Sequence, residues 1–207
     1  HREILERRCS CASARDFLSL EELRCALEVR AVRSLHEAAA IYSEAAKARG
    51  RVSAADAASV CMSHASACHC QLVIFRCFQA RASPSATPSR VDDVLGRLCA
   101  VYGIHVLEGD MWHLSRYLTP SQGDMLREAL VLAVSGLRGE ALGLAESWRI
   151  PDAALGSALG RDDGDYCRGL MEGTAKEPLN MAGDVTAAYA SSLRPLMQGG
   201  PRMSAKL

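Results

Sequence analysis

The segment HASACHC, residues 64–70, holds the residue types best suited to binding a metal ion. His64 and Cys68 are four residues apart, so on a helix they share one face and could bind zinc. His69 faces away from both, and Cys70 points elsewhere on the same helix. A structural zinc site needs four converging ligands, and no spaced cysteine pair or His–Glu pair supplies the rest. We therefore interpret these residues as helix-packing residues and expect no metal site, unless two more ligands come from another helix.

The segment LGSALGRDDGDY, residues 155–166, raises the question of an ion or phosphate site. A calcium loop that began at Asp163 would need an oxygen ligand at its fifth position and glycine at its sixth. Those positions hold Cys167 and Arg168, so the pattern fails. The Lys-Ser/Thr ending of a phosphate loop is also missing, as is a preceding strand. We predict a tight turn between helices, in which the glycines permit the backbone path and the aspartates cap the next helix.

Other polar residues give no catalytic constellation. Glu108 and Asp110 are close in sequence, but two such carboxylates usually belong to a solvated turn. No nucleophile-elbow motif occurs, and we assign no catalytic residue. Arg161 is expected to pair with a neighbouring aspartate. Trp112 and Trp148 are interpreted as packing residues at helix ends.

The last three residues are Ala205, Lys206 and Leu207. A terminal Ser-Lys-Leu is a peroxisomal address, and alanine replaces serine here by another small residue. A receptor that reads the lysine and the terminal leucine carboxylate should still accept this ending. We therefore predict a peroxisomal targeting tripeptide that binds a peroxisomal import receptor.

The elements that must position these residues are helical almost throughout, because apolar residues recur every three or four positions. No run of alternating β-branched residues is long enough for a sheet, so we predict an all-α, up-and-down bundle. On one helix face we expect Leu20, Leu23, Leu27 and Leu35. The longer helices are expected from Ser19 to Gly50, from about Ser53 to at least Phe75, from Val91 to a break around Gly109 and Asp110, from Thr119 to about Trp148, and from Asn180 to about Leu193.

The helix that contains residues 57–75 has no charged side chain in that stretch, which is long enough to cross a membrane. Serine, histidine and glutamine interrupt the stretch, however. A helix that is apolar nearly all round is more simply the buried central member of a bundle, and we expect no membrane span.

The domain organisation follows from composition. We expect a leading segment at residues 1–16, a helical bundle at residues 17–196 with a linker near residues 82–90, and a flexible tail at residues 197–207. The linker contains two prolines and three serines. Residue 1 is His rather than Met, so we expect a partial or processed chain, and no secretory signal is visible at its start.

The composition is that of a soluble globular protein, with 207 residues of which 49% are hydrophobic and 23% charged. Lys plus Arg and Asp plus Glu both number 24, giving a net charge of zero. This balance disfavours nucleic acid as a partner. The nine cysteines are an odd number without a secretory signal, so we expect them reduced, with Cys61, Cys68 and Cys77 as small buried side chains.

Several motifs together resemble one family. The segments IPDAALGSALGRDDGDYCRGL (150–170) and EPLN (177–180) are similar to the C-terminal region of peroxisomal acyl-CoA oxidases. LCAVYGIHVLEGD (98–110) resembles a Leu-Cys-x-x-Tyr-Gly…Gly-Asp stretch of that family, and ACHCQLVIFRCF (67–78) resembles its Ala-His-Cys-His helix. In the first region the matching positions are Leu155, Gly156, Ser157, Leu159, Gly160, Arg161, Asp163, Gly164, Tyr166, Pro178, Leu179 and Asn180. In the last segment His69 and Cys70 match, whereas Gln71 departs from the second histidine.

The resemblance extends from about residue 17 to the end, and it implies part of an FAD-dependent oxidase. Such an enzyme converts a fatty acyl-CoA and O₂ into the trans-2-enoyl-CoA and hydrogen peroxide, which opens peroxisomal fatty-acid β-oxidation. The family's catalytic glutamate and most flavin contacts lie upstream of the matched region, so no catalytic or cofactor-binding residue is carried over. The resemblance further implies a homodimer and a cofactor site that this region supports without completing it. It also weighs against zinc, because the family is not a zinc enzyme.

Two alternatives remain open. The chain could be a free-standing helical interaction module without catalytic activity, which binds partners through a large apolar face. It could also be a metal-binding bundle that uses His64 and Cys68.

Overall fold

The computed structural model describes residues 2–82, 89–161, 163–181, 187 and 189–199, and these contain helices and no strand. The prediction of an all-α fold is therefore confirmed. The chain divides into two compact units, His1–Leu144 and Ala145–Leu207. In chain order the elements are α1 (Arg2–Glu6), η1 (Ala14–Leu18), α2 (Leu20–Arg49), α3 (Arg51–Ala82), α4 (Arg90–Glu108), α5 (Met111–Leu114), α6 (Pro120–Leu137), η2 (Arg138–Glu140), α7 (Ala141–Glu146), α8 (Asp152–Leu155), η3 (Ala158–Gly160), α9 (Tyr166–Lys176), α10 (Pro178–Met181), η4 (Tyr189–Leu193) and α11 (Arg194–Gly199).

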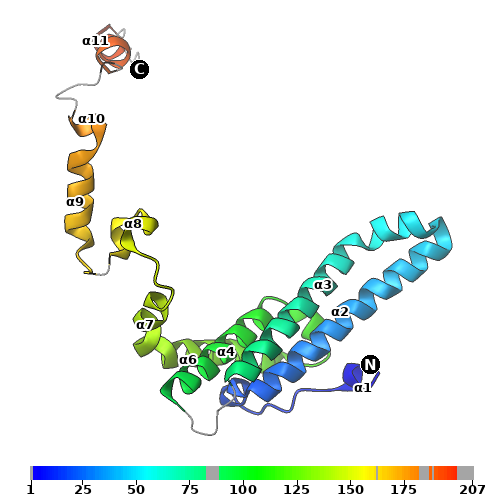
Figure 1. Cartoon of the computed structure of the whole chain (residues 1–207). Coiled ribbons are helices and arrows are strands. Elements are labelled where there is room, and N and C mark those ends of the chain that lie inside the picture. The colour runs from blue at the N-terminus through cyan, green and yellow to red at the C-terminus, as the bar shows by residue number, and fades with distance from the viewer. Residues whose placement is uncertain (1, 83–88, 162, 182–186, 188, 200–207) are drawn as a thin grey trace, which may run out of the picture. The chain divides into compact units, whose positions relative to one another are not determined.

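The first unit is built on a long antiparallel hairpin of α2 and α3, which lie side by side (Figure 1). α2 begins where the sequence predicts, because the Ser19 hydroxyl accepts a hydrogen bond from the backbone N–H of Glu22. It ends at Gly50, whose φ of 83° lies in the region that favours glycine. α3 starts directly afterwards at Arg51, so the connection is a single residue and the two helices must pack against each other.

α4 packs against both helices of the hairpin, and α6 packs against α4 and η1. α6 starts where the sequence predicts, with a capping box at Thr119. Thr119 Oγ1 accepts from the N–H of Gln122, and the Gln122 side chain accepts from the N–H of Thr119. The core contains fully buried large side chains, each contributing about 1.5–3 kcal/mol by its removal from water. They include Phe17, Leu23, Leu27, Phe75, Ile104, Leu107, Leu114 and Leu126.

Hydrogen bonds to its backbone attach the leading segment to this core. The Gln122 side-chain amide donates to the carbonyls of Cys9 (3.1 Å) and Cys11 (3.0 Å), and the N–H of Cys9 donates to the carbonyl of Tyr117 (2.9 Å). Cys11 and Ala14 are buried in the same core cluster. The glutamine that completes the cap of α6 therefore also fixes the path of the segment before α2.

α4 approaches α2 and α3 closely at Gly103. A Cβ atom built there would lie 2.7 Å from Phe75 Cε2 and 3.2 Å from Leu23 Cδ1. Since real Cβ atoms do not approach carbon so closely, α4 can pack at this distance from α2 and α3 only with glycine at this position. This packing requirement accounts for the glycine of the Tyr-Gly pair singled out in the sequence.

α3 is not the fully buried helix that its composition predicts. Its buried residues form one stripe of mostly small side chains, and the large apolar residues on other faces are exposed to solvent. The buried set is Ala54, Ala58, Ala65, Cys68, Leu72, Phe75 and Ala82. The exposed set is Val52, Val60, Met62, Val73 and Ile74. Two long helices joined by one residue leave too few neighbours to cover all sides of α3.

By length and composition α3 could cross a membrane, and it is the one such helix in the described part of the chain. Its most apolar window has a mean hydropathy of 1.2, and 28% of that window is buried. A single helix of this kind is weak evidence for a span, because core helices of soluble proteins have the same profile.

Three further expectations about side chains are wrong. Leu35 is 59% exposed, whereas Arg30 and Ser34 on the same helix are buried, so the buried face of α2 is not the apolar stripe alone. Trp112 and Trp148 are each 78% exposed and do not pack at helix ends. All nine cysteines are free, as expected, but their burial differs: Cys68 is buried, Cys61 is half-buried and Cys77 is exposed.

Two helix boundaries also differ from the prediction. The helix that starts at Pro120 ends at Leu137 rather than near Trp148, because a turn of 3₁₀ helix separates it from α7. Asn180 lies inside the short helix α10, and its side-chain amide donates to the carbonyl of Thr174 at 2.8 Å. It therefore fixes the end of α9 instead of beginning a helix.

The glycine-aspartate segment of the second unit is the interhelical turn that the sequence predicts. Gly156 and Gly164 have φ values of 59° and 69°. Asp165 caps α9 by accepting from the N–H of Arg168, and Asp163 accepts from Arg161 Nε at 3.0 Å. These interactions keep the pKa of Asp163 far below its usual value, chiefly because of the Arg161 hydrogen bond.

Parts of the expected organisation fall outside the described residues. They are residues 83–88 of the linker, residues 182–186 and 188 of the predicted last helix, and residues 200–207 of the tail, including Ala205, Lys206 and Leu207. The domain boundaries at residues 16, 82–90 and 196 remain predictions.

We predict that Gly103→Ala lowers the free energy of unfolding by about 1–3 kcal/mol, because the added methyl group would force Phe75 and Leu23 apart. Gly96→Ala is the matched control on the same helix, where a Cβ atom has nothing within 4 Å. It should stabilise the protein by about 0.4–1 kcal/mol through the lower entropy of the unfolded chain. Urea unfolding followed by circular dichroism measures both. Equal stability of the two variants would contradict the close packing at Gly103.

Candidate functional site

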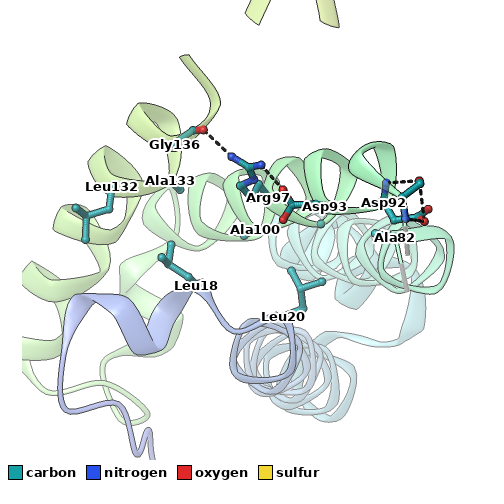
Figure 2. Close-up of a pocket in the computed structure, with 12 residues that line it drawn as sticks. Leu18, Leu20, Ala82, Asp92, Asp93, Arg97, Ala100, Leu132, Ala133 and Gly136 are labelled. Atoms are coloured by element: carbon teal, nitrogen blue, oxygen red, sulfur yellow. Dashed lines mark hydrogen bonds and ion pairs between the residues drawn. The ribbon is translucent and has the colours of Figure 1, made fainter. Parts of the chain in front are cut away.

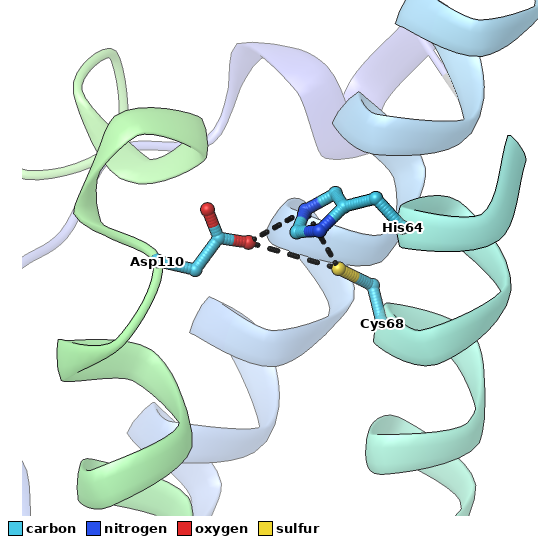
Figure 3. A group of neighbouring side chains, drawn as sticks. All are labelled: His64, Cys68 and Asp110. Atoms are coloured by element: carbon cyan, nitrogen blue, oxygen red, sulfur yellow. Dashed lines mark hydrogen bonds and ion pairs between the residues drawn. The ribbon is translucent and has the colours of Figure 1, made fainter. Parts of the chain in front are cut away.

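Three residues that could together bind a metal ion meet where α3 faces the end of α4 (Figure 3). His64 and Cys68 lie one turn apart on α3, with Cys68 Sγ 3.3 Å from His64 Nε2. Asp110 is the N-cap residue of α5, just after Gly109 ends α4. Its Oδ2 atom lies 2.9 Å from His64 Nε2 and 3.7 Å from Cys68 Sγ. The structure therefore adds a carboxylate to the His–Cys pair that the sequence singles out.

The second oxygen of Asp110 connects the cluster to α5 and α2. Oδ1 of Asp110 lies 2.7 Å from His113 Nδ1, and Nε2 of His113 lies 2.9 Å from Glu37 Oε2. The His113 ring also stacks on that of His64, with 4.6 Å between centroids and 23° between planes. A carboxylate, an imidazole and a second carboxylate thus form one chain of hydrogen bonds beside His64.

Arg30 lies beneath this chain and is 2% exposed. Its Nη1 donates to the carbonyl of Val106 at 2.9 Å, and its Nη2 donates to Gln71 Oε1. Its Nε makes no hydrogen bond and lies 4.0 Å from Asp110 Oδ2. A buried guanidinium is costly to desolvate unless it is paired, so Asp110 is its charge partner across the helices.

Burial and charge set the protonation of two groups. Burial raises the pKa of the Cys68 thiol, Ser34 and Arg30 lower it, and Asp110 raises it, so the net shift is upward. Burial lowers the pKa of His113, but hydrogen bonds to Asp110 and Glu37 raise it, and here too the net shift is upward. Without a bound cation Cys68 is therefore a neutral thiol, which is a poor nucleophile.

A cavity of about 670 Å³ opens beside the cluster. It carries charges of both signs, and its acidic and basic groups lie close enough to pair, as Glu108 and Arg127 do at 3.5 Å. Its lining is Arg30, His64, Ala67, Gln71, Tyr102, His105, Val106, Glu108, Gly109, Asp110 and Arg127. Small polar species can reach His64 and Asp110 through it.

A second cavity, of about 520 Å³, lies between η1, α2, α4 and α6 (Figure 2). Apolar side chains such as Leu18, Leu20 and Leu132 line it. At its edge Arg97 donates to the carbonyl of Gly136 at 2.9 Å and pairs with Asp93. The cavity has no charged group free to hold an anion among the residues that line it.

The sequence locates His64 and Cys68 but misses Asp110 and His113 as their neighbours. It places Asp110 on a surface turn with Glu108. The only local signal was the Gly-Asp pair that ends α4, which marks a helix boundary without showing what lies across from it. The contact depends on how α4 packs on α3, and that is a long-range property.

Comparisons with known proteins identify relatives along nearly the whole chain. The family model described as acyl-CoA oxidase matches residues 19–198. Peroxisomal acyl-coenzyme A oxidase 1 of Rattus norvegicus is 31% identical over 185 residues, which are 87% of this chain and 28% of that protein. Peroxisomal acyl-coenzyme A oxidase 1 of Arabidopsis thaliana is 28% identical over 200 residues, or 94% and 29% of the two proteins.

Solved structures show the same fold. Arabidopsis thaliana acyl-CoA oxidase 1 matches with a TM-score of 0.84 at 27% identity, over 95% of this chain and 30% of that one. Acyl-CoA oxidase-2 of Caenorhabditis elegans, solved with FAD, ascaroside-CoA and ATP, has a TM-score of 0.83 at 25% identity, over 97% and 29%. The chain thus spans less than a third of the length of these relatives.

We predict that Asp110→Ala lowers the free energy of unfolding by about 3 kcal/mol, because it leaves buried Arg30 without its nearest charge partner. Asp124→Ala is the control: that carboxylate is 81% exposed and pairs only weakly with Arg127 at 3.5 Å. Its effect should stay within about 0.5 kcal/mol. Thermal or urea unfolding measures both changes, and a small effect at Asp110 would rule out its role in holding Arg30.

Proposed function

The chain belongs to the acyl-CoA oxidase family, and from this premise we propose that it is the C-terminal helical part of an FAD-dependent peroxisomal acyl-CoA oxidase. The observation that carries the proposal is the family match over residues 19–198, together with the fold shared along the chain. The ordered motifs of the second unit, with their left-handed glycines and capping aspartates, support the C-terminal position.

The proposed reaction of the whole enzyme is the oxidation of a fatty acyl-CoA by O₂. The substrate loses two hydrogens from its α and β carbons and becomes the trans-2-enoyl-CoA. Oxygen takes up both hydrogens and leaves as hydrogen peroxide. FAD supplies the redox chemistry when bound, and a carboxylate base for the α-proton would come from outside this chain.

The two cavities described above do not fit the diphosphate of FAD. Asp92 and Asp93 line the 520 Å³ cavity with one arginine, Arg97, which is already paired. In the 670 Å³ cavity Glu108 and Asp110 face Arg127 and Arg30. An anionic ligand prefers free N–H groups and unpaired cations, so we assign no flavin contact and no catalytic step to these residues.

The role we propose for this chain is therefore structural support of a larger flavoenzyme that works as a homodimer. The exposed apolar side chains of α3 support this role. Val52 and Val60 are 82% and 80% exposed, and Met62, Val73 and Ile74 on the same helix are exposed as well. Burial against another domain or a second copy would remove this apolar surface from water.

We also propose peroxisomal localisation. The relatives reported above carry that location in their names, and the chain ends in Ala205, Lys206 and Leu207. A small residue, a cation and a terminal leucine together resemble the peroxisomal address that a soluble import receptor reads.

We predict that the polypeptide that carries this chain in cells is far larger than 22.2 kDa. Captured by an antibody to residues 163–176, it should show flavin absorbance and release peroxide when given palmitoyl-CoA and oxygen. Residues 1–207 alone should do neither, because no base or flavin site is assigned to them. A cellular product of 22.2 kDa would instead support a free-standing interaction module, and peroxide from the isolated chain would refute the proposal.

We predict that deletion of Leu207 abolishes peroxisomal import of the full-length protein, because the receptor loses the terminal side chain that it reads. Fluorescence microscopy of tagged protein, in cells without an untagged copy that could carry it in, measures this. Met203→Ala, outside the tripeptide, is the control and should import normally. Unchanged import of the deletion variant would contradict the targeting assignment.

A further inference from the structure

The spacing of ligand atoms in the His64–Cys68–Asp110 cluster is close to that around a tetrahedral metal ion. Zinc binds nitrogen and oxygen at about 2.0–2.2 Å and sulfur at about 2.3 Å, which places neighbouring ligand atoms about 3.2–3.6 Å apart. The three separations here are 2.9 Å, 3.3 Å and 3.7 Å. An ion could therefore enter with ligand shifts of a few tenths of an ångström.

We propose that His64, Cys68 and Asp110 bind one divalent transition-metal ion of the zinc class. An imidazole, a thiolate and a carboxylate together favour zinc over magnesium or calcium, which prefer oxygen ligands alone. The sequence alone argued against such a site because two more ligands were missing. Asp110 supplies one of them from the α4–α5 junction.

The backbone holds the three ligands before any ion arrives. His64 and Cys68 are fixed by their spacing on α3, where residues four apart share a face. Asp110 is fixed because α4 ends at Gly109, and α4 itself is seated on α3 through Gly103. Ordering these side chains therefore costs little on binding.

The surrounding groups orient the ligands in the way that metal sites require. Oδ1 of Asp110 is bound to His113 Nδ1, which leaves Oδ2 directed at the other two ligands. His113 is held in turn by Glu37 at 2.9 Å. Such outer hydrogen bonds fix the direction and basicity of a ligand, and their loss typically weakens binding about 10–100-fold.

The charge balance permits a dication despite the nearby arginine. With the thiol deprotonated, Cys68 and Asp110 contribute two negative charges, and Glu37, linked to Asp110 through His113, contributes a third. These three charges offset the two of the ion and the one of Arg30. Arg30 stays hydrogen-bonded to Val106 and Gln71. Binding releases the thiol proton to solvent through the 670 Å³ cavity, and the same cavity gives a water molecule access to a fourth coordination position.

Cobalt(II) substitution tests the site, because a thiolate ligand gives a sulfur-to-cobalt absorption band that oxygen and nitrogen ligands do not. The complete chain should bind one equivalent of cobalt with this band, and zinc should displace it. Cys68→Ala should abolish the band and weaken zinc binding by at least about 100-fold in competition with a chromophoric chelator. His113→Gln should keep the band and weaken binding about 10–100-fold.

Cys70→Ala is the matched control, since it removes an exposed thiol two residues away on the same helix. It should bind metal like the parent chain. Cys68→Ser keeps the side-chain shape, with oxygen in place of sulfur, and is the variant to use if Cys68→Ala loses the circular dichroism signal of its helices. The proposal is overturned if the parent chain shows no thiolate band, or if the band survives in Cys68→Ser. It is equally overturned if Cys70→Ala loses the band, which would assign the metal to surface thiols.

Discussion

The close approach of α4 to the α2–α3 hairpin is the constraint on which the rest of this structure depends. It is possible only because Gly103 presents no side chain to Phe75 and Leu23. With α4 seated there, Ile104 and Leu107 are fully buried and the helix ends opposite the middle of α3. The position of Asp110 is therefore a consequence of hydrophobic packing one turn or two earlier in the chain. Chemistry at the cluster depends on apolar contacts in the core.

Arg30 shows how a buried charge can specify an arrangement of helices. It reaches the carbonyl of Val106 on α4 and Gln71 on α3 from its own position on α2. A guanidinium offers five donors in a fixed plane, so these hydrogen bonds restrict how the three helices can be placed relative to one another. Buried ion pairs add little net stability compared with apolar side chains of the same size. Here the buried charge instead helps to fix how α2, α3 and α4 are placed relative to one another. Asp110 supplies the opposite charge.

Much of the local structure could be predicted from the sequence, because local structure depends on neighbours in the chain. The caps at Ser19 and Thr119 and the turn at residues 155–166 follow from side-chain hydrogen bonds within a few residues. The exposure of Trp112 and of the large residues on α3 could not be predicted, since it depends on which helices are present to cover them. In the same way, the meeting of His64 with Asp110 joins residues 46 positions apart and rests on helix packing. The spacing of apolar residues predicted the fold class and the resemblance predicted the family, but neither brought a residue of the cluster in as a ligand.

The uneven burial of the cysteines has a practical consequence for handling and for ageing of the molecule. Cys11, Cys68 and Cys99 are shielded, and burial raises the pKa of the Cys99 thiol to about 11. Cys70 and Cys77 are exposed on α3, seven residues apart and beside exposed Val73 and Ile74. Two molecules that associate through this exposed apolar surface would bring the exposed thiols of Cys70 and Cys77 close to those of the other copy. Oxidation by O₂ in air would then convert this reversible contact into an intermolecular disulfide. The exposed cysteines would react first, and the buried ones would not.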